Sequence, residues 1–252
     1  MTWLAHNMYQ EYFGTGYDVV HKFGRNLAVP TSFVGVSVGG LYLTPQVAAA
    51  TNLRVKAGNT NDTAAGSGAR GITLLGLDET GAEVEETLAT AGVSASSTTS
   101  ATFIRLYRAY VSTSGTYGTT TAGSHAADIV IENGAGGTDW LTIDSTGYPR
   151  GQSEIAFYSV PLGKTAYVTS IQCSVQSNKT ADIVMVQRRN ILDAAVPYQA
   201  VRTVLQFGAV AGQASLRPAT PFGPFPALTD IGFLSKGAAV SEVDVNFEIV
   251  RI

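Results

Sequence analysis

Apolar and polar residues alternate one by one in several short stretches of this chain, most regularly near residue 252. In "SEVDVNFEIVRI" the apolar residues Val243, Val245, Phe247 and Ile249 alternate with Glu242, Asp244, Asn246 and Glu248. An apolar residue at every second position is the period of a β-strand with one buried and one wet face. A helix needs a repeat near 3.6 residues, so this pattern restricts the region to a sheet.

Other stretches have the same character, and turn-forming sequences separate them. In "YVTSIQCSV" the residues Ile171, Cys173 and Val175 share one face, which makes Cys173 a small core residue rather than a reactive thiol. The sequences "PLGKTA" and "LDETGA" are typical of turns between neighbouring strands. Many short strands with Gly-rich turns predict an all-β fold of the sandwich or barrel type.

We expect two antiparallel domains in series, each resembling a β-sandwich or jelly roll, with an N-terminal arm before them. The arm takes residues 1–30, the first sandwich residues 31–147 and the second sandwich residues 148–252. The segment "STGYPRGQS" is rich in turn-forming residues and separates two blocks of roughly a hundred residues, about the size of one sandwich each.

The chain contains few charged residues, and this composition narrows the range of functions that we expect for it. Charged residues make up 14% of the sequence, against about 25% in average soluble domains. Interface cores are depleted in charge, so burial in an assembly would suit this composition. The 16 basic residues form no cluster of the kind that binds nucleic acid directly. The sequence has no signal-peptide pattern and no membrane-length apolar run, so we expect synthesis in a cytoplasm and no membrane contact.

Residues 35–39 match G-x-S-x-G, the pattern of a hydrolase nucleophile elbow centred on Ser37. That elbow requires a helix after the serine, followed by an acid and a histidine in chain order. Glycines, β-like residues and a proline follow Ser37 instead, and the only downstream histidine is His125. We therefore expect Ser37 to lie in a Gly-containing strand or bulge and the chain to have no enzymatic activity. The histidines show no metal-ligand spacing, so no metal or cofactor is expected.

Two aromatic-rich stretches are the candidates for contact with a partner. Residues 1–30 are apolar and punctuated by glycine, and such a segment is costly to leave in water. It packs either onto another molecule or onto its own domain. The Pro-rich loop 220–233 either binds a partner or caps its own sandwich. The candidate interface residues are Trp3, Tyr9, Tyr12, Phe13, Tyr17, Phe23, Arg25, Phe222 and Phe225.

A set of motifs, taken in order, resembles virion structural proteins of tailed bacteriophages, a group common in marine phages. The motifs are "HKFGRNLAVPTSF", "NTNDTAAGSGARGITLLGLDETGAEVEETL", "FIRLYRAYV", "IAFYSVPLGKTAYVTSI" and "PFGPFPALTDIGFL". The resemblance runs from about Lys22 to residue 252 and transfers no catalytic residue. It implies an accessory capsid protein of the cement or decoration type, located on the capsid surface. The implied partners are the major capsid protein, further copies of this chain in a homotrimer, and other virion proteins.

Three other functions stay open. A tail or neck adaptor, or a fibre-associated protein, would differ from a cement protein in copy number. A carbohydrate- or receptor-binding module would present exposed aromatics in a line, for which Tyr107, Tyr110 and Tyr117 are candidates. An enzyme such as a depolymerase would need paired catalytic residues, which the sequence does not single out.

Overall fold

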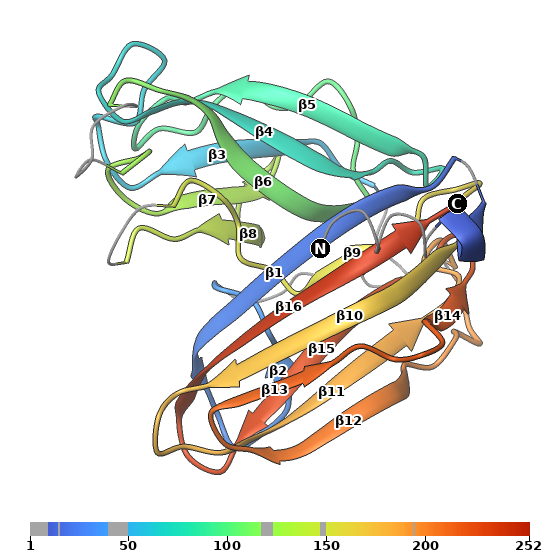
Figure 1. The fold of residues 1–252 in the computed structure, drawn as a ribbon. Helices are drawn as coiled ribbons and strands as arrows, with labels where there is room; N and C mark the ends of the chain where they lie inside the picture. Colours follow the sequence, from blue (N-terminus) through green and yellow to red (C-terminus); the bar gives the residue numbers. More distant parts are fainter. Residues whose placement is uncertain (1–9, 15, 40–49, 117–122, 147–149, 194) are drawn as a thin grey trace.

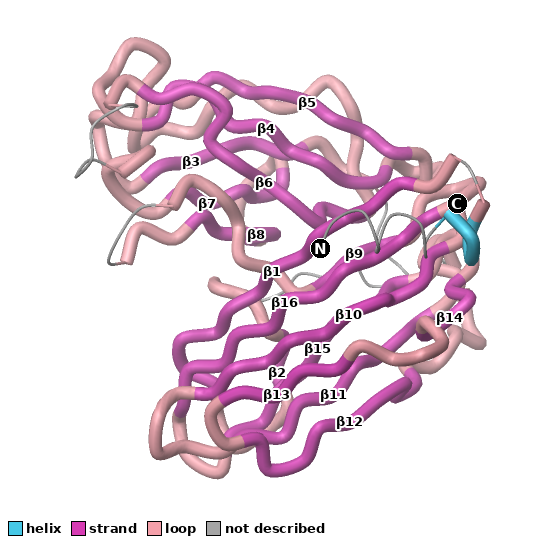
Figure 2. The backbone as a smooth tube through the Cα atoms, in the orientation of Figure 1, coloured by secondary structure: helices cyan, strands magenta, loops and turns pink. Residues whose placement is uncertain are grey.

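The computed structural model describes residues 10–14, 16–39, 50–116, 123–146, 150–193 and 195–252. Within these residues sixteen strands form four antiparallel sheets, and a short helical turn covers residues 10–13 (Figures 1 and 2). The all-β fold class predicted from the alternating pattern is confirmed.

Two of the sheets form the larger sandwich, which we call the C-terminal sandwich. Its sheet I has the strand order β1 (Asp18–Val29), β16 (Ser241–Arg251), β10 (Ala166–Val175) and β13 (Gln213–Leu216), and β14 (Phe222–Phe225) also pairs with β10. Its sheet II has the order β12 (Arg202–Val210), β11 (Ala181–Arg188), β15 (Asp230–Gly237) and β2 (Val34–Gly35), and β9 (Phe157–Ser159) also pairs with β15.

The other two sheets form the N-terminal sandwich. Sheet III has the order β3 (Leu53–Ala57), β7 (Ile129–Asn133) and β8 (Asp139–Ile143). Sheet IV has the order β5 (Glu83–Ala89), β4 (Ala69–Leu77) and β6 (Arg105–Ser114). Figure 1 shows this sandwich above the edge of sheet I that β1 forms.

Alternation in the strands decides which side chains fill the cores. The four alternating apolar residues of β16, from Val243 to Ile249, are all buried and face sheet II, where the Phe247 ring lies 5.0 Å from the Phe233 ring of β15. Cys173 is fully buried on the same side of sheet I, and burial raises the pKa of its thiol to about 12. Its predicted role as a small core residue is confirmed.

Strand β1 comes from the range 1–30 that the sequence assigned to an arm. It pairs with β16 from Asp18 to Val29 and becomes the edge strand of sheet I. Gly24 allows β1 to cross the segment before β9 closely, because a Cβ at this position would lie 2.1 Å from the Ala156 nitrogen. The C-terminal sandwich is therefore built from both ends of the described chain, rather than from residues 148–252 alone.

The apolar cores extend across the boundary between the two sandwiches. Leu77, Ile104 and Tyr107 of the N-terminal half belong to the cluster of the C-terminal sandwich. In return, Ile155 and Phe157 pack into the cluster of the N-terminal sandwich. This interlocking removes apolar surface of both halves from water, so each half stabilises the other.

Phe233→Ala should lower the free energy of unfolding by about 3–5 kcal/mol, because it leaves a cavity opposite Phe247. Denaturant unfolding measures the change. Val240→Ala is the control, since Val240 is 61% exposed and its loss should change stability by no more than about 0.5 kcal/mol. Equal effects of the two substitutions would contradict the described core.

Candidate functional site

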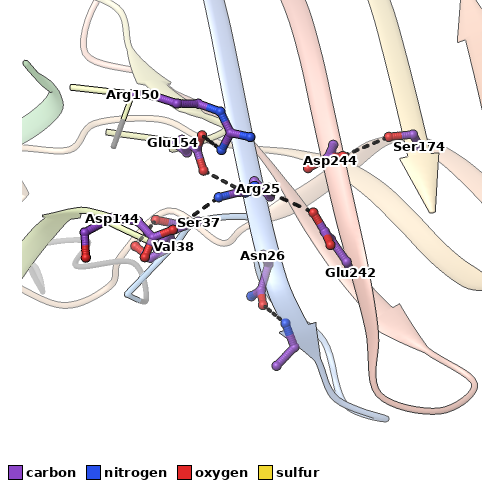
Figure 3. Close-up of polar contacts among 12 residues, drawn as sticks. Arg25, Asn26, Ser37, Val38, Asp144, Arg150, Glu154, Ser174, Glu242 and Asp244 are labelled. Carbon is purple, nitrogen blue, oxygen red and sulfur yellow. Dashed lines mark hydrogen bonds and ion pairs between the residues drawn. The ribbon is translucent and has the colours of Figure 1, made fainter. Parts of the chain in front are cut away.

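Buried charged side chains gather where the two sandwiches meet, in three groups built around Arg25, Arg105 and Arg251. The first is shown in Figure 3. β1 places Arg25 so that its Nη2 lies 3.2 Å from Asp144 and its Nε lies 2.7 Å from Glu154. Glu242 of β16 lies 3.8 Å from Arg25, and Arg150 lies 3.2 Å from Glu154. Burial raises the pKa of Glu154, while Arg25 and Arg150 act in the opposite direction.

The second group is the most deeply buried. Arg105 at the start of β6 donates from Nε and Nη2 to the two oxygens of Asp230, at 3.0 and 3.1 Å. Ser159 Oγ also donates to the Asp230 carboxylate, at 2.6 Å, and Arg188 Nη2 lies 3.5 Å from it. Arg105 and Asp230 are 2% and 3% exposed, so this two-point ion pair joins β6 of one sandwich to β15 of the other inside the protein.

The third group lies near the end of β16. Arg251 pairs with Glu83 of β5 and donates to the Tyr158 hydroxyl at 2.9 Å, and its Nε lies 3.4 Å from Asp18. Tyr107 donates its hydroxyl to Glu83 at 3.0 Å. Burial raises the pKa of Tyr158 to about 12 and also raises that of Tyr107, so both phenols are neutral at ordinary pH.

Lys22 is a buried amine between β1 and β6. Its Nζ donates to the backbone carbonyl of Tyr107 and lies 5.7 Å from the centre of the Tyr107 ring. Burial lowers the pKa of Lys22 well below its ordinary value, and the positive charge of Arg108 acts in the same direction.

A groove of about 820 Å³ opens beside these contacts. Its lining comes from β1, β16, β10 and β13 of sheet I and, across from them, from β6 and residues 152–153. The lining contains amides, hydroxyls, guanidinium groups and aromatic rings, together with aliphatic residues and the acidic residues Glu83 and Glu248. Such a lining offers many hydrogen-bond donors and acceptors within one concave surface.

The elbow-like pattern around Ser37 is not arranged as a catalytic site. Ser37 is buried, donates its hydroxyl to the Val38 carbonyl at 3.2 Å and forms a β-bridge with Ile155. The ring nitrogens of His125 instead contact Ser124 Oγ at 2.8 Å and the Asp144 carbonyl at 3.1 Å. Strand β2 ends at Gly35, and Ser37 forms an isolated bridge between a bend at Val36 and a turn at residues 38–39, so the predicted strand is found only in part.

The described ranges contain neither a cluster of metal ligands nor a membrane-spanning helix. In this part of the chain, no three or more His, Cys, Asp and Glu side chains lie together in a way that could hold a metal ion. Among the same residues, no helix has the length and apolar character needed to cross a membrane.

The structure separates the candidate interface residues into different environments. Trp3 and Tyr9 lie outside the described residues. Tyr12 is 56% exposed, with its ring 4.9 Å from that of Phe13, which in turn lies 5.0 Å from the ring of Tyr167 on sheet I. Tyr17, Phe23 and Phe222 are half-buried, and Phe23 lines the groove. The arm therefore docks partly on its own sandwich and leaves Tyr12 accessible.

Two of the candidate interface residues are buried inside the protein instead of lying on its surface. Phe225 is 2% exposed and belongs to the apolar core, because β14 pairs with β10 and turns this ring inward. Arg25 is 9% exposed and is held by acidic side chains at the junction. Neither side chain is available to a partner. The proposed line of tyrosines is not formed either, since Tyr107 is buried, Tyr110 is half-buried and Tyr117 lies outside the described residues.

Comparisons with known proteins give no family. No family model matches the chain, and no curated protein matches its sequence. Solved structures of the infectious bursal disease virus Gt and Gx strains are 9% and 10% identical, with TM-scores of 0.24 and 0.26, each covering 94% of this chain and 72% of that chain. The subviral particle of VP2 from the same virus is 7% identical with a TM-score of 0.21, covering 93% of this chain and 76% of that one. At such scores the likeness establishes neither a shared fold nor a shared function.

Removing Asp230 should be strongly destabilising, because Arg105 and Arg188 would stay buried without their carboxylate. We expect Asp230→Ala to cost about 3–5 kcal/mol in the free energy of unfolding. Lys164→Met is the control, since it breaks the exposed pair with Asp18 and should cost at most about 1 kcal/mol. Denaturant unfolding of both variants measures these changes. A small loss of unfolding free energy for Asp230→Ala would mean that the Arg105–Asp230 pair does not hold the junction.

We expect Lys22 to make the stability of the folded chain depend on pH in the alkaline range. The pKa of Lys22 is lower in the folded chain than in the unfolded chain. At a pH below the unfolded-state pKa, the unfolded chain therefore binds the proton more tightly, and this binding lowers the stability of the folded state. The melting temperature should therefore rise as the pH approaches the ordinary pKa of a lysine, about 10.4, and Lys22→Met should remove that part of the rise. An identical pH profile in the variant would show that Lys22 is not the group responsible.

Proposed function

We propose that this chain is a structural protein of a bacteriophage virion, a cement or decoration protein that binds and stabilises the shell of the major capsid protein. The ordered motifs from about Lys22 to residue 252 support this proposal through their resemblance to accessory virion proteins. The structural observation that carries it is the junction: buried ion pairs and shared apolar cores hold the two sandwiches together as one body.

A rigid junction suits a protein that bridges neighbouring subunits of a shell. Such a bridge resists separation of the subunits only if its own two halves do not move apart. Pulling Arg105 away from Asp230 would break a buried two-point ion pair, which costs several kcal/mol. The low charge content also suits a chain that covers part of its surface with other proteins.

Exposed apolar side chains supply contact points for partners in this proposal. Those on the described surface include Tyr12, Leu27, Phe33, Leu162 and Val196. One contact patch of ordinary size buries about 800 Å² per partner. A homotrimer would join three patches and raise the effective affinity for the shell steeply. In this role the chain performs no catalysis and touches neither nucleic acid nor membrane.

Mass spectrometry of purified virions tests the proposal by counting copies of this chain against the major capsid protein. A cement protein should be present at about one copy per capsid subunit, or at about one per three, as expected for symmetric positions on the lattice. A count of only a few copies per virion would contradict the proposal and favour a tail, neck or fibre-associated protein. Complete absence from virions would exclude all of these roles.

A further inference from the structure

One row of side chains crosses the outer face of sheet I inside the groove. The register places Phe23 opposite Asn246, Asn246 opposite Gln172, and Gln172 opposite Ser215. Opposite residues of antiparallel strands share a face, with their Cβ atoms about 4.5–5.5 Å apart. The four side chains therefore form a continuous row over β1, β16, β10 and β13, and all four line the groove.

The polar members of this row are free to bind a ligand. Asn246, Gln172 and Ser215 are exposed, and within the described ranges their side chains make no hydrogen bond to the protein. Each amide offers two donors and one acceptor oxygen, and the hydroxyl of Ser215 can both donate and accept. A ligand that carries many hydroxyl groups matches this mixture, because each hydroxyl also needs both kinds of partner.

Phe23 adds an apolar surface at one end of the row. It is half-buried on a face whose other exposed positions are mainly polar. A sugar ring presents hydroxyl groups at its edge and C–H groups on its faces. An aromatic ring beside amide side chains can pack on such a face while the amides bind the edge.

The opposite wall gives the groove depth and charge. Arg108 of β6 donates to the His21 carbonyl of β1, and exposed Gln152 lies beside it in the lining. Arg217 lines the far end, and among the described residues it forms no ion pair. The volume of about 820 Å³ lies within the range of about 300–1,000 Å³ that is usual for small-ligand sites.

We propose that this groove is an oligosaccharide-binding site, in which Asn246, Gln172 and Ser215 bind sugar hydroxyls and Phe23 packs on a sugar ring. A wet strand face is ordinarily polar, but here the polar row lies in a groove that β6 also lines, and it ends at an aromatic ring. The site does not depend on the virion role. If the chain is carried on a capsid, the groove would give that surface an affinity for glycans.

The test uses the isolated full chain and a panel of maltotriose, chitotriose and trigalacturonate, with binding followed by saturation-transfer NMR and titration. At least one member of the panel should bind. The double substitution Gln172→Ala and Asn246→Ala, and separately Phe23→Leu, should each weaken that binding by about tenfold or more.

Gln213→Ala is the matched control, because Gln213 is an exposed glutamine on the same face of β13 but outside the groove lining. It should bind as the unmodified chain does. Thermal unfolding of all variants checks that the exposed amide substitutions leave the fold intact. The proposal is overturned if no member of the panel binds, or if the double variant binds as tightly as Gln213→Ala. Neither result bears on the copy number of the chain in virions.

Discussion

The ion pair between Arg105 and Asp230 is the contact on which the arrangement of the two sandwiches depends. Each charge has lost nearly all contact with water, and a buried charge is tolerated only when it is paired and hydrogen-bonded. The two parallel hydrogen bonds from Arg105 form only when β6 and β15 are docked, whereas the third, from Ser159 of β9, comes from the same sandwich as Asp230. Separating the sandwiches would expose two apolar surfaces and also disrupt this pair.

The contacts around Arg25 and Arg251 extend the same constraint along β1 and β16. With the sandwiches fixed in this way, β6 lies beside β1, the edge strand of sheet I, and contributes part of the groove lining. The contacts that make the chain rigid, as a bridging role in a shell requires, also give its accessible groove a fixed shape. A preformed site of this kind loses little conformational entropy when it binds a ligand.

Local sequence patterns predicted the strands but not their partners across the molecule. The alternation in β16 and around Cys173 was sufficient to place these residues in a sandwich core, because strand periodicity depends only on neighbouring residues. Arg105 and Asp230 are separated by 125 positions, and no local pattern indicates that they pair, so only the fold reveals their pairing. The aromatic composition of residues 1–30 suggested an arm, whereas pairing with β16 decides that Asp18–Val29 is an edge strand.

Differential scanning calorimetry of the full chain tests most directly whether the junction makes the two sandwiches one unit. We predict a single transition whose calorimetric enthalpy equals the van't Hoff enthalpy, as for a two-state protein. Two resolved transitions, or a calorimetric enthalpy well above the van't Hoff value, would show that the sandwiches unfold separately and would contradict the role assigned to the Arg105–Asp230 pair.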